Sequence, residues 1–140
     1  MRTSRAQDVG RFVLAAGLLT AGLAHFFWAR EEFRAQVPSW LDVDDDLVVH
    51  VSGGVEIVIG LALLVARRHR AVVGWATAAF FVAIFPGNIA QYVEPTDAFG
   101  LDSDAARAVR LAFQPGLLAA ALWSTGEWSA WRARRRGSDA

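Results

Sequence analysis

The sequence contains no cysteine and no lysine, and the first absence excludes whole classes of chemistry. Without cysteine the chain cannot form disulfides, and it has no thiolate nucleophile, CxxC redox motif or thiolate metal site. It also lacks a phosphate-binding loop, a nucleophile triad, a haem-ligand pair, a flavin motif and a plausible metal cluster. We therefore expect no catalytic residue and no metal site, and we do not expect the chain to be an enzyme on its own.

What the chain does have is hydrophobic length, with 54% hydrophobic residues and its charges gathered in short clusters. Between these clusters lie four apolar stretches, residues 10–28, 47–66, 71–93 and 105–126. Each has the ~20 residues that an α-helix needs to cross a bilayer core of ~30 Å. The helices of a soluble bundle would each carry a polar face, but "IVIGLALLVA" and "GLLAAALW" have none. The sequence predicts an all-α fold, an integral membrane four-helix bundle, in a single domain over residues 1–140.

The distribution of arginine predicts the orientation of these helices. The amino end, the link "RRHR" and the tail at residues 127–140 are basic, whereas the other two connections are acidic. Because short cytoplasmic segments carry an excess of basic residues, both termini are expected to be cytoplasmic. The arginine-rich tail is explained as a topology signal, so the expected partner is the lipid bilayer and not nucleic acid. We call the opposite side of the bundle the outer half.

The long first outer connection, residues 30–46, has its own pattern. Phe33, Val37, Trp40 and Leu41 recur at helical spacing, which predicts a short amphipathic helix of one or two turns in the membrane interface. The acidic run that follows is expected to begin the second span, with Asp46 as its N-cap.

Polar side chains inside the apolar stretches are few, and such residues usually face a bundle interior. Given the predicted directions of the helices, every one of them falls in the outer half, and the inner half is expected to be almost purely apolar. Two prolines within the spans are expected to break their helices and to line a cavity. The candidate ligand-binding residues are His25, Ser52, Glu56, Asn88, Gln91, Arg110 and Gln114, and the candidate helix breaks are Pro86 and Pro115.

Helical spacing also predicts which of these side chains meet. Ser52, Glu56 and Gly60 form one stripe, and Gly17, Ala21 and His25 form another, so small residues let the first two spans approach closely. From this we expect an interior cluster in which Glu56 pairs with Arg110, capped by His25, Asn88 and Gln114. The cluster is consistent with a ligand-binding or proton-handling pocket, or with hydrogen bonds that only hold four helices in register.

Three segments of the chain resemble the DoxX family of small bacterial membrane proteins. They are "SGGVEIVIGLALLVARRHRAVVGW", "FPGNIAQY" and "RLAFQ", and the resemblance extends from about residue 17 to residue 123, including "GLAHFF" and the later Val-Pro. It implies a four-helix membrane fold in the bacterial cytoplasmic membrane and a loose association with redox chemistry, as in a subunit of a thiosulfate:quinone oxidoreductase. The chain departs from the family where Trp28, Ala29 and Arg30 replace the usual proline, and its lack of cysteine excludes a thiol mechanism.

Three functions remain open at this point. The first is an accessory subunit linked to membrane redox chemistry, with protein partners in a redox complex, in which the outer cluster binds a quinone or another small lipophilic ligand. There Glu56 or His25 would carry protons and Arg110 would hold a carbonyl oxygen or anion. The second is a structural or assembly protein without a ligand. The third is a small transporter, for which four helices make a thin path unless the protein forms a homo-oligomer.

Overall fold

The computed structural model describes residues 3–65 and 67–138, and within these residues every regular element is an α-helix. The all-helical prediction is therefore confirmed. Four helices are long, and their starts agree with the predicted spans to within about five residues; the predicted end of the second span, residue 66, lies outside the described residues. The elements are α1 (Arg5–Phe27), α2 (Arg30–Arg34), α3 (Asp45–Val65), α4 (Arg70–Val93), α5 (Asp104–Ser124) and α6 (Glu127–Ser138).

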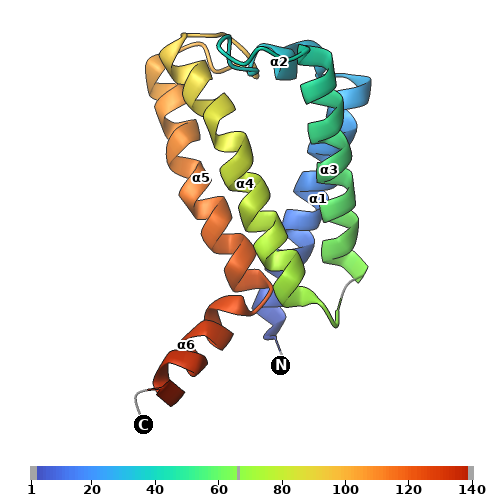
Figure 1. Ribbon diagram of the computed structural model, residues 1–140, viewed down its shortest axis with the longest axis vertical. Helices are drawn as coiled ribbons and strands as arrows, with labels where there is room; N and C mark the ends of the chain where they lie inside the picture. The colour runs from blue at the N-terminus through green and yellow to red at the C-terminus, as the bar shows by residue number, and fades with distance from the viewer. Residues whose placement is uncertain (1–2, 66, 139–140) are drawn as a thin grey trace.

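The four long helices run up and down the molecule, so that sequence neighbours are antiparallel (Figure 1). Most contacts between helices occur within two pairs, α1 with α3 and α4 with α5. Figure 1 shows the pairs close together at the end that carries both chain termini and farther apart at the end that carries α2. We call these ends the terminal end and the α2 end. Both termini thus lie at one end of the molecule.

Side-chain caps fix where the long helices begin. Ser4 accepts from the Gln7 backbone N–H while the Gln7 side chain accepts from the Ser4 N–H, a capping box that starts α1 five residues before the predicted span. Ser103 accepts from the Ala106 N–H at the start of α5. At the start of α3 the backbone N–H of Leu47 donates to the Asp44 carboxylate. The prediction that Asp46 caps α3 is wrong. The capping side chain is that of Asp44, which stands three residues before Leu47 and accepts from its free N–H.

Small residues allow α1 and α3 to pack closely, as the sequence predicted. A Cβ on Gly53 would lie 2.6 Å from the His25 Cβ, and a Cβ on Gly60 would lie 2.8 Å from the Leu19 Cγ. On α1 the close approach is made by Gly22, where a Cβ would lie 2.8 Å from the Gly53 carbonyl oxygen. Gly17 was the wrong residue for this role, since a Cβ there would meet nothing within 4 Å.

An apolar core joins the four long helices on the terminal side of the predicted site residues. Its buried members come from all of them and pack against further half-buried leucine, valine and phenylalanine side chains: Ala15, Leu18, Ile59, Leu63, Phe81 and Ala121. Side chains this well buried hold the two helix pairs together on the terminal side, so any space between the pairs is left toward the α2 end.

Neither internal proline breaks its helix. Helix α4 continues through Pro86 and α5 continues through Pro115, so the predicted helix breaks are wrong. A proline removes one backbone donor, but the hydrogen bonds on either side can keep the helix going. Pro115 is exposed and lines no cavity of the site described below, whereas Pro86 borders a groove.

The terminal half is less apolar than the sequence predicted. Arg11 is only 2% exposed, and its guanidinium donates to the backbone carbonyls of Leu63 and Leu64 at the carboxyl end of α3. Carbonyls at a helix end lack intrahelical partners, and a cation close to them is favourable. The expectation of an almost purely apolar inner half is therefore wrong, because this half must satisfy the helix ends that it contains.

The surface is apolar where that of a soluble protein would be polar. Valines on the outward faces of α3 and α4 are largely exposed, with Val58 and Val72 each at 67%. By length and composition three helices can cross a membrane: α1, α3 and α4. Helix α5 is as long as α3, with 21 residues, but charged residues stand in its first two turns: Asp104, Arg107 and Arg110.

The basic tail contains a helix that the sequence analysis did not predict. Helix α6 follows α5 after a turn at Gly126, whose φ is +86°. Its start is tied back to α4 by a 3.0 Å hydrogen bond from the Trp75 indole N–H to Glu127. Arginine side chains lie over its tryptophan rings, Arg132 on Trp128 and Arg135 on Trp131. This stacking places apolar and basic surface side by side at the terminal end.

Candidate functional site

Most of the predicted site residues line one cavity of about 420 Å³ between the helix pairs, toward the α2 end. We call this cavity the chamber. Its walls come from α1, α3, α4 and α5, and residues of α2 and of the two connections at the α2 end close it from above. The predicted residues that line it are His25, Ser52, Glu56, Asn88 and Arg110, and its other walls are Ala21, Phe33, Gln36, Ile84, Phe99 and Leu101.

The Glu56 carboxylate is the central polar group of the chamber. Glu56 is 6% exposed, and its Oε2 lies 3.2 Å from Nδ1 of His25. That nitrogen also lies 2.8 Å from the carbonyl oxygen of Ala21. A carbonyl can only accept, so Nδ1 carries the proton and donates it to Ala21. Glu56 Oε2 is consequently a buried oxygen without a hydrogen-bond partner among the described residues.

The imidazole of His25 is held in place from two sides. Its ring stacks on Phe33 with centroids 3.4 Å apart, and Phe33 in turn meets Phe99 edge-on at 4.7 Å. Gly53 lies beneath the ring and leaves no room for a side chain. The backbone bond to Ala21 and these aromatic contacts fix His25 as a rigid wall of the chamber beside Glu56.

Beside the chamber runs a chain of hydrogen bonds centred on Gln114, which was predicted as a site residue but does not itself line the chamber. Its Oε1 accepts from Asn88 at 3.2 Å and from the Arg110 guanidinium at 3.1 Å. Its Nε2 donates to the backbone carbonyl of Phe81 at 2.5 Å. Gln114 therefore ties α5 to α4 one turn before Pro86, and it positions Arg110 at the wall of the chamber.

The predicted ion pair between Glu56 and Arg110 is wrong. Among the described residues no carboxylate oxygen lies within 4.0 Å of the Arg110 guanidinium, which bonds along its own helix to Gln114 instead. The close packing of α1 on α3 at Gly53 brings the His25 imidazole to 3.2 Å from the Glu56 carboxyl group. Glu56 and Arg110 thus line one chamber without pairing with each other.

Gln91, although predicted to belong to the cluster, lies outside the chamber. It is 2% exposed, and its Nε2 donates to the carbonyls of Thr96 and Ala98. Its Oε1 accepts from Gln36 at 2.7 Å. All of its hydrogen bonds therefore go to the two connections at the α2 end. We call these connections, together with α2, the roof of the chamber.

The sequence analysis missed the roof residues of the chamber. Gln36, Phe99 and Leu101 come from connections, and Phe33 was noted only for its helical spacing. The roof is tied down by bonds between distant segments, from Ser39 to Glu94 at 2.6 Å and from the Phe99 N–H to Glu32 at 3.0 Å. Helical periodicity carries no signal for such residues, because the path of a connection decides what it covers.

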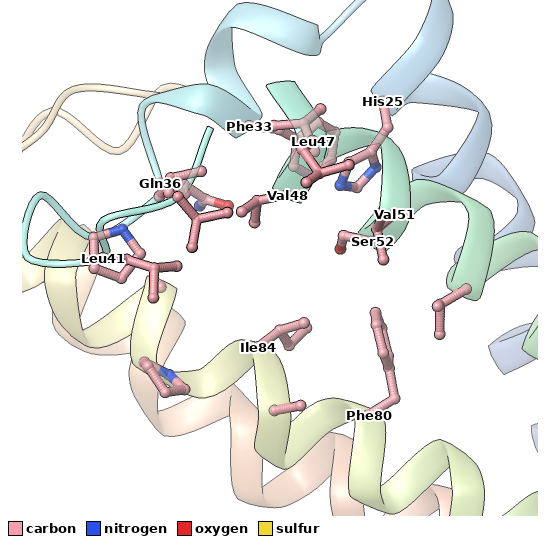
Figure 2. Close-up of a pocket in the computed structure, with 18 of the residues that line it drawn as sticks. His25, Phe33, Gln36, Leu41, Leu47, Val48, Val51, Ser52, Phe80 and Ile84 are labelled. Atoms are coloured by element: carbon pink, nitrogen blue, oxygen red, sulfur yellow. The ribbon is translucent and has the colours of Figure 1, made fainter. Parts of the chain in front are cut away.

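Beside the chamber lies a groove of about 560 Å³ between α3 and α4. Figure 2 shows Leu47, Val48, Val51 and Ser52 of α3 on one side and Phe80 and Ile84 of α4 on the other, with Leu41 and Gln36 of the connection at the left. The groove borders the chamber, since five residues line both: His25, Phe33, Gln36, Ser52 and Ile84.

A family model described as a domain of unknown function, DUF8561, matches residues 14–125 of the chain. The chain belongs to this family. The matched range includes every residue of the chamber and ends where α6 is about to begin. No curated protein and no solved structure matches the chain. Membership in DUF8561 thus assigns no activity, and the chemistry of the chamber has to carry the functional argument.

Proposed function

We propose that the protein is an integral membrane protein of four spanning helices, α1, α3, α4 and α5, with both termini on the cytoplasmic side of a bacterial cytoplasmic membrane. The inverted surface supports this proposal, because polar side chains are buried and apolar ones face outward. Helix α5 shares this pattern, with Phe113 63% and Val109 60% exposed. The arginines of α5 lie in its first two turns, at the level of the roof and the chamber.

The function that the geometry supports best is binding of a small lipophilic ligand with a polar head group in the chamber. The observation that carries the proposal is the buried Oε2 of Glu56, which has no hydrogen-bond partner in the part of the chain that the structure describes. An unpaired buried polar atom costs free energy, and native proteins retain few of them. Arg110 presents donors to the same chamber without a carboxylate partner. A ligand that donates to Glu56 and accepts from Arg110 would satisfy both groups.

A quinone or quinol is the ligand class that we propose for this site. Its ring oxygens act as acceptors when oxidised and as donors when reduced, so they suit a site with an arginine and a carboxylate. The resemblance to the DoxX family supports a non-catalytic, accessory role in membrane redox chemistry with protein partners. The chemistry of a bound quinone would then be carried out by those partners, because this chain offers no electron-transfer group.

The test is a titration of the purified full chain in lipid nanodiscs with a benzoquinone that carries no chain, kept reduced as its quinol so that its hydroxyl groups can donate to Glu56. We expect saturable binding to the wild type and binding about tenfold weaker or more for Glu56→Gln, since the amide replaces one of the two accepting carboxyl oxygens by an NH2 group that can only donate. Glu127→Gln is the matched control, because Glu127 is also buried, at 7% exposure, but lies at the terminal end. If Glu56→Gln binds the quinone as the wild type does, this function is wrong.

The alternative function, a structural or assembly protein without a ligand, is favoured by one specific observation. Gln114 of α5 is hydrogen-bonded to the Asn88 side chain and to the Phe81 carbonyl, both of α4. This part of the cluster therefore needs no ligand. Under this alternative no quinone binds to the wild type, and the polar groups serve only to hold α4 and α5 in register.

A further inference from the structure

The groove between α3 and α4 is apolar except where it meets the chamber. Its polar side chains His25, Gln36 and Ser52 all line the chamber as well, apart from the indole of Trp40 at its upper edge. The remaining walls are valine, leucine, isoleucine, phenylalanine, alanine, proline and glycine. The two adjoining cavities therefore form one site with a polar end and a long apolar end.

The groove opens sideways along α3 and also at the α2 end, where its lining residues Leu47 and Trp40 are 55% and 66% exposed. Val51 is 57% exposed and Val55 is 38% exposed, although both line the groove. Toward the α2 end, by contrast, the chamber is covered by the roof, which hydrogen bonds tie together from Ser39 to Glu94 and from Gln36 to Gln91. The side opening at Val51 and Val55 gives a molecule in the bilayer a way to the chamber through the groove.

We propose that the ligand enters laterally from the bilayer between α3 and α4, and that it carries a hydrocarbon chain which stays in the groove while its head lies in the chamber. This inference rests on the proposed function and adds the chemical class: a chain-bearing lipid with a polar head. The lining residues that the two cavities share, and the division into a polar chamber and an apolar groove, select this occupant. A chainless polar solute would leave the groove unfilled, and a lipid without a hydrogen-bonding head would leave Glu56 unpaired.

The experiment uses the full chain in nanodiscs and a decyl-benzoquinone, likewise kept reduced as its quinol, with a photoreactive diazirine at the end of its chain. After irradiation, mass spectrometry of the digested protein locates the label. We expect labels on the lining segments of α3 and α4, residues 47–55 and 80–87, and loss of these labels when unlabelled decyl-benzoquinone is added in excess.

Two variants fill the groove from opposite walls, Val55→Trp on α3 and Ala83→Trp on α4. Each is expected to reduce the competed labelling about tenfold, because overpacking excludes the chain. The matched controls are Val58→Trp and Val82→Trp, which add the same bulk to exposed positions that do not line the groove. Using two walls keeps the test valid if one variant fails to fold.

The outcomes separate this inference from the proposed function. Labels spread over all lipid-facing positions and not competed would overturn the lateral groove, while Glu56-dependent binding of chainless benzoquinone in the same samples would leave the proposed function standing. Equal labelling of the groove-filling and control variants would overturn the groove in the same way. If neither quinone binds, both proposals fall together.

Discussion

Glu56 and Gln91 are both nearly inaccessible to solvent, yet their hydrogen bonding differs completely. Every hydrogen-bonding contact of Gln91 ends on another part of the roof, whereas Glu56 Oε2 has no partner. A buried polar group that is fully bonded fixes a local structure, and one left unbonded is costly unless a ligand meets it. At the scale of single residues this difference distinguishes a structural role from a binding role.

Replacing Gln91 by alanine tests the structural role. The substitution leaves the Thr96 carbonyl and the Gln36 amide without these partners and removes one of the two donors to the Ala98 carbonyl, so we expect a loss of about 1–3 kcal/mol in the free energy of unfolding. Thermal unfolding measures the loss, and limited proteolysis should show faster cleavage within residues 94–103. Tyr92→Phe is the control, because it changes the next side chain without removing a bond of the roof. An unchanged unfolding temperature together with lost quinone binding would contradict this assignment.

Among the elements, the close pairing of α1 with α3 positions the chamber. Gly53 lies directly below His25, and the space that it leaves lets the imidazole reach the side of Glu56. The next residue, Gly54, faces open space, since a Cβ there would meet nothing within 4 Å. Two adjacent glycines therefore have opposite structural importance.

Alanine at each of these glycines tests the importance of the pairing. Gly53→Ala should lower the unfolding temperature and weaken quinone binding, because its Cβ would lie 2.6 Å from the His25 Cβ and push the helices apart. Gly54→Ala should leave binding unchanged and stabilise the helix by up to about 1 kcal/mol, since alanine favours helix over glycine. Equal effects of the two substitutions on stability and binding would show that the pairing does not position the site.

The sequence predicted the long helices well, because their apolar length and their helical stripes are local properties. It placed Glu56, His25, Asn88, Arg110 and Gln114 together correctly, since a shared depth follows from helix direction and from a rise of ~1.5 Å per residue. It did not predict which of them bond. The distance across a bundle depends on how closely each pair packs, and for that reason His25, and not Arg110, lies within 4 Å of the Glu56 carboxyl group. The roof depends on the paths of the connections, and no periodic pattern reveals those.

Across the whole molecule, the two ends differ in chemistry. The terminal end carries both termini, the basic helix α6 and the buried Arg11, while the α2 end carries the roof and the acidic connections (Figure 1). The excess of arginine at the terminal end is the feature that, in membrane proteins, marks the cytoplasmic side. Such an orientation would place the chamber and its lateral opening in the outer leaflet.

Reporter fusions test this orientation. A fluorescent protein fused after residue 140 should fold and fluoresce, and alkaline phosphatase at the same place should be inactive, because that enzyme needs the oxidising side of the membrane. Phosphatase inserted between residues 42 and 43, in the connection that leads to α3, should be active. The reverse pattern at the two positions would invert the proposed topology and would place the chamber toward the cytoplasm.

The most direct test of the central claim, that Glu56 is present for a ligand and not for the fold, is the thermal unfolding of Glu56→Leu without quinone. If the carboxylate is an unpaired buried group, an apolar side chain of similar size removes its cost, and the unfolding temperature should rise by a few degrees while quinone binding is lost. If Glu56 instead holds the helices together through His25, the same variant will unfold at a lower temperature than the wild type, and the account given for the chamber is contradicted.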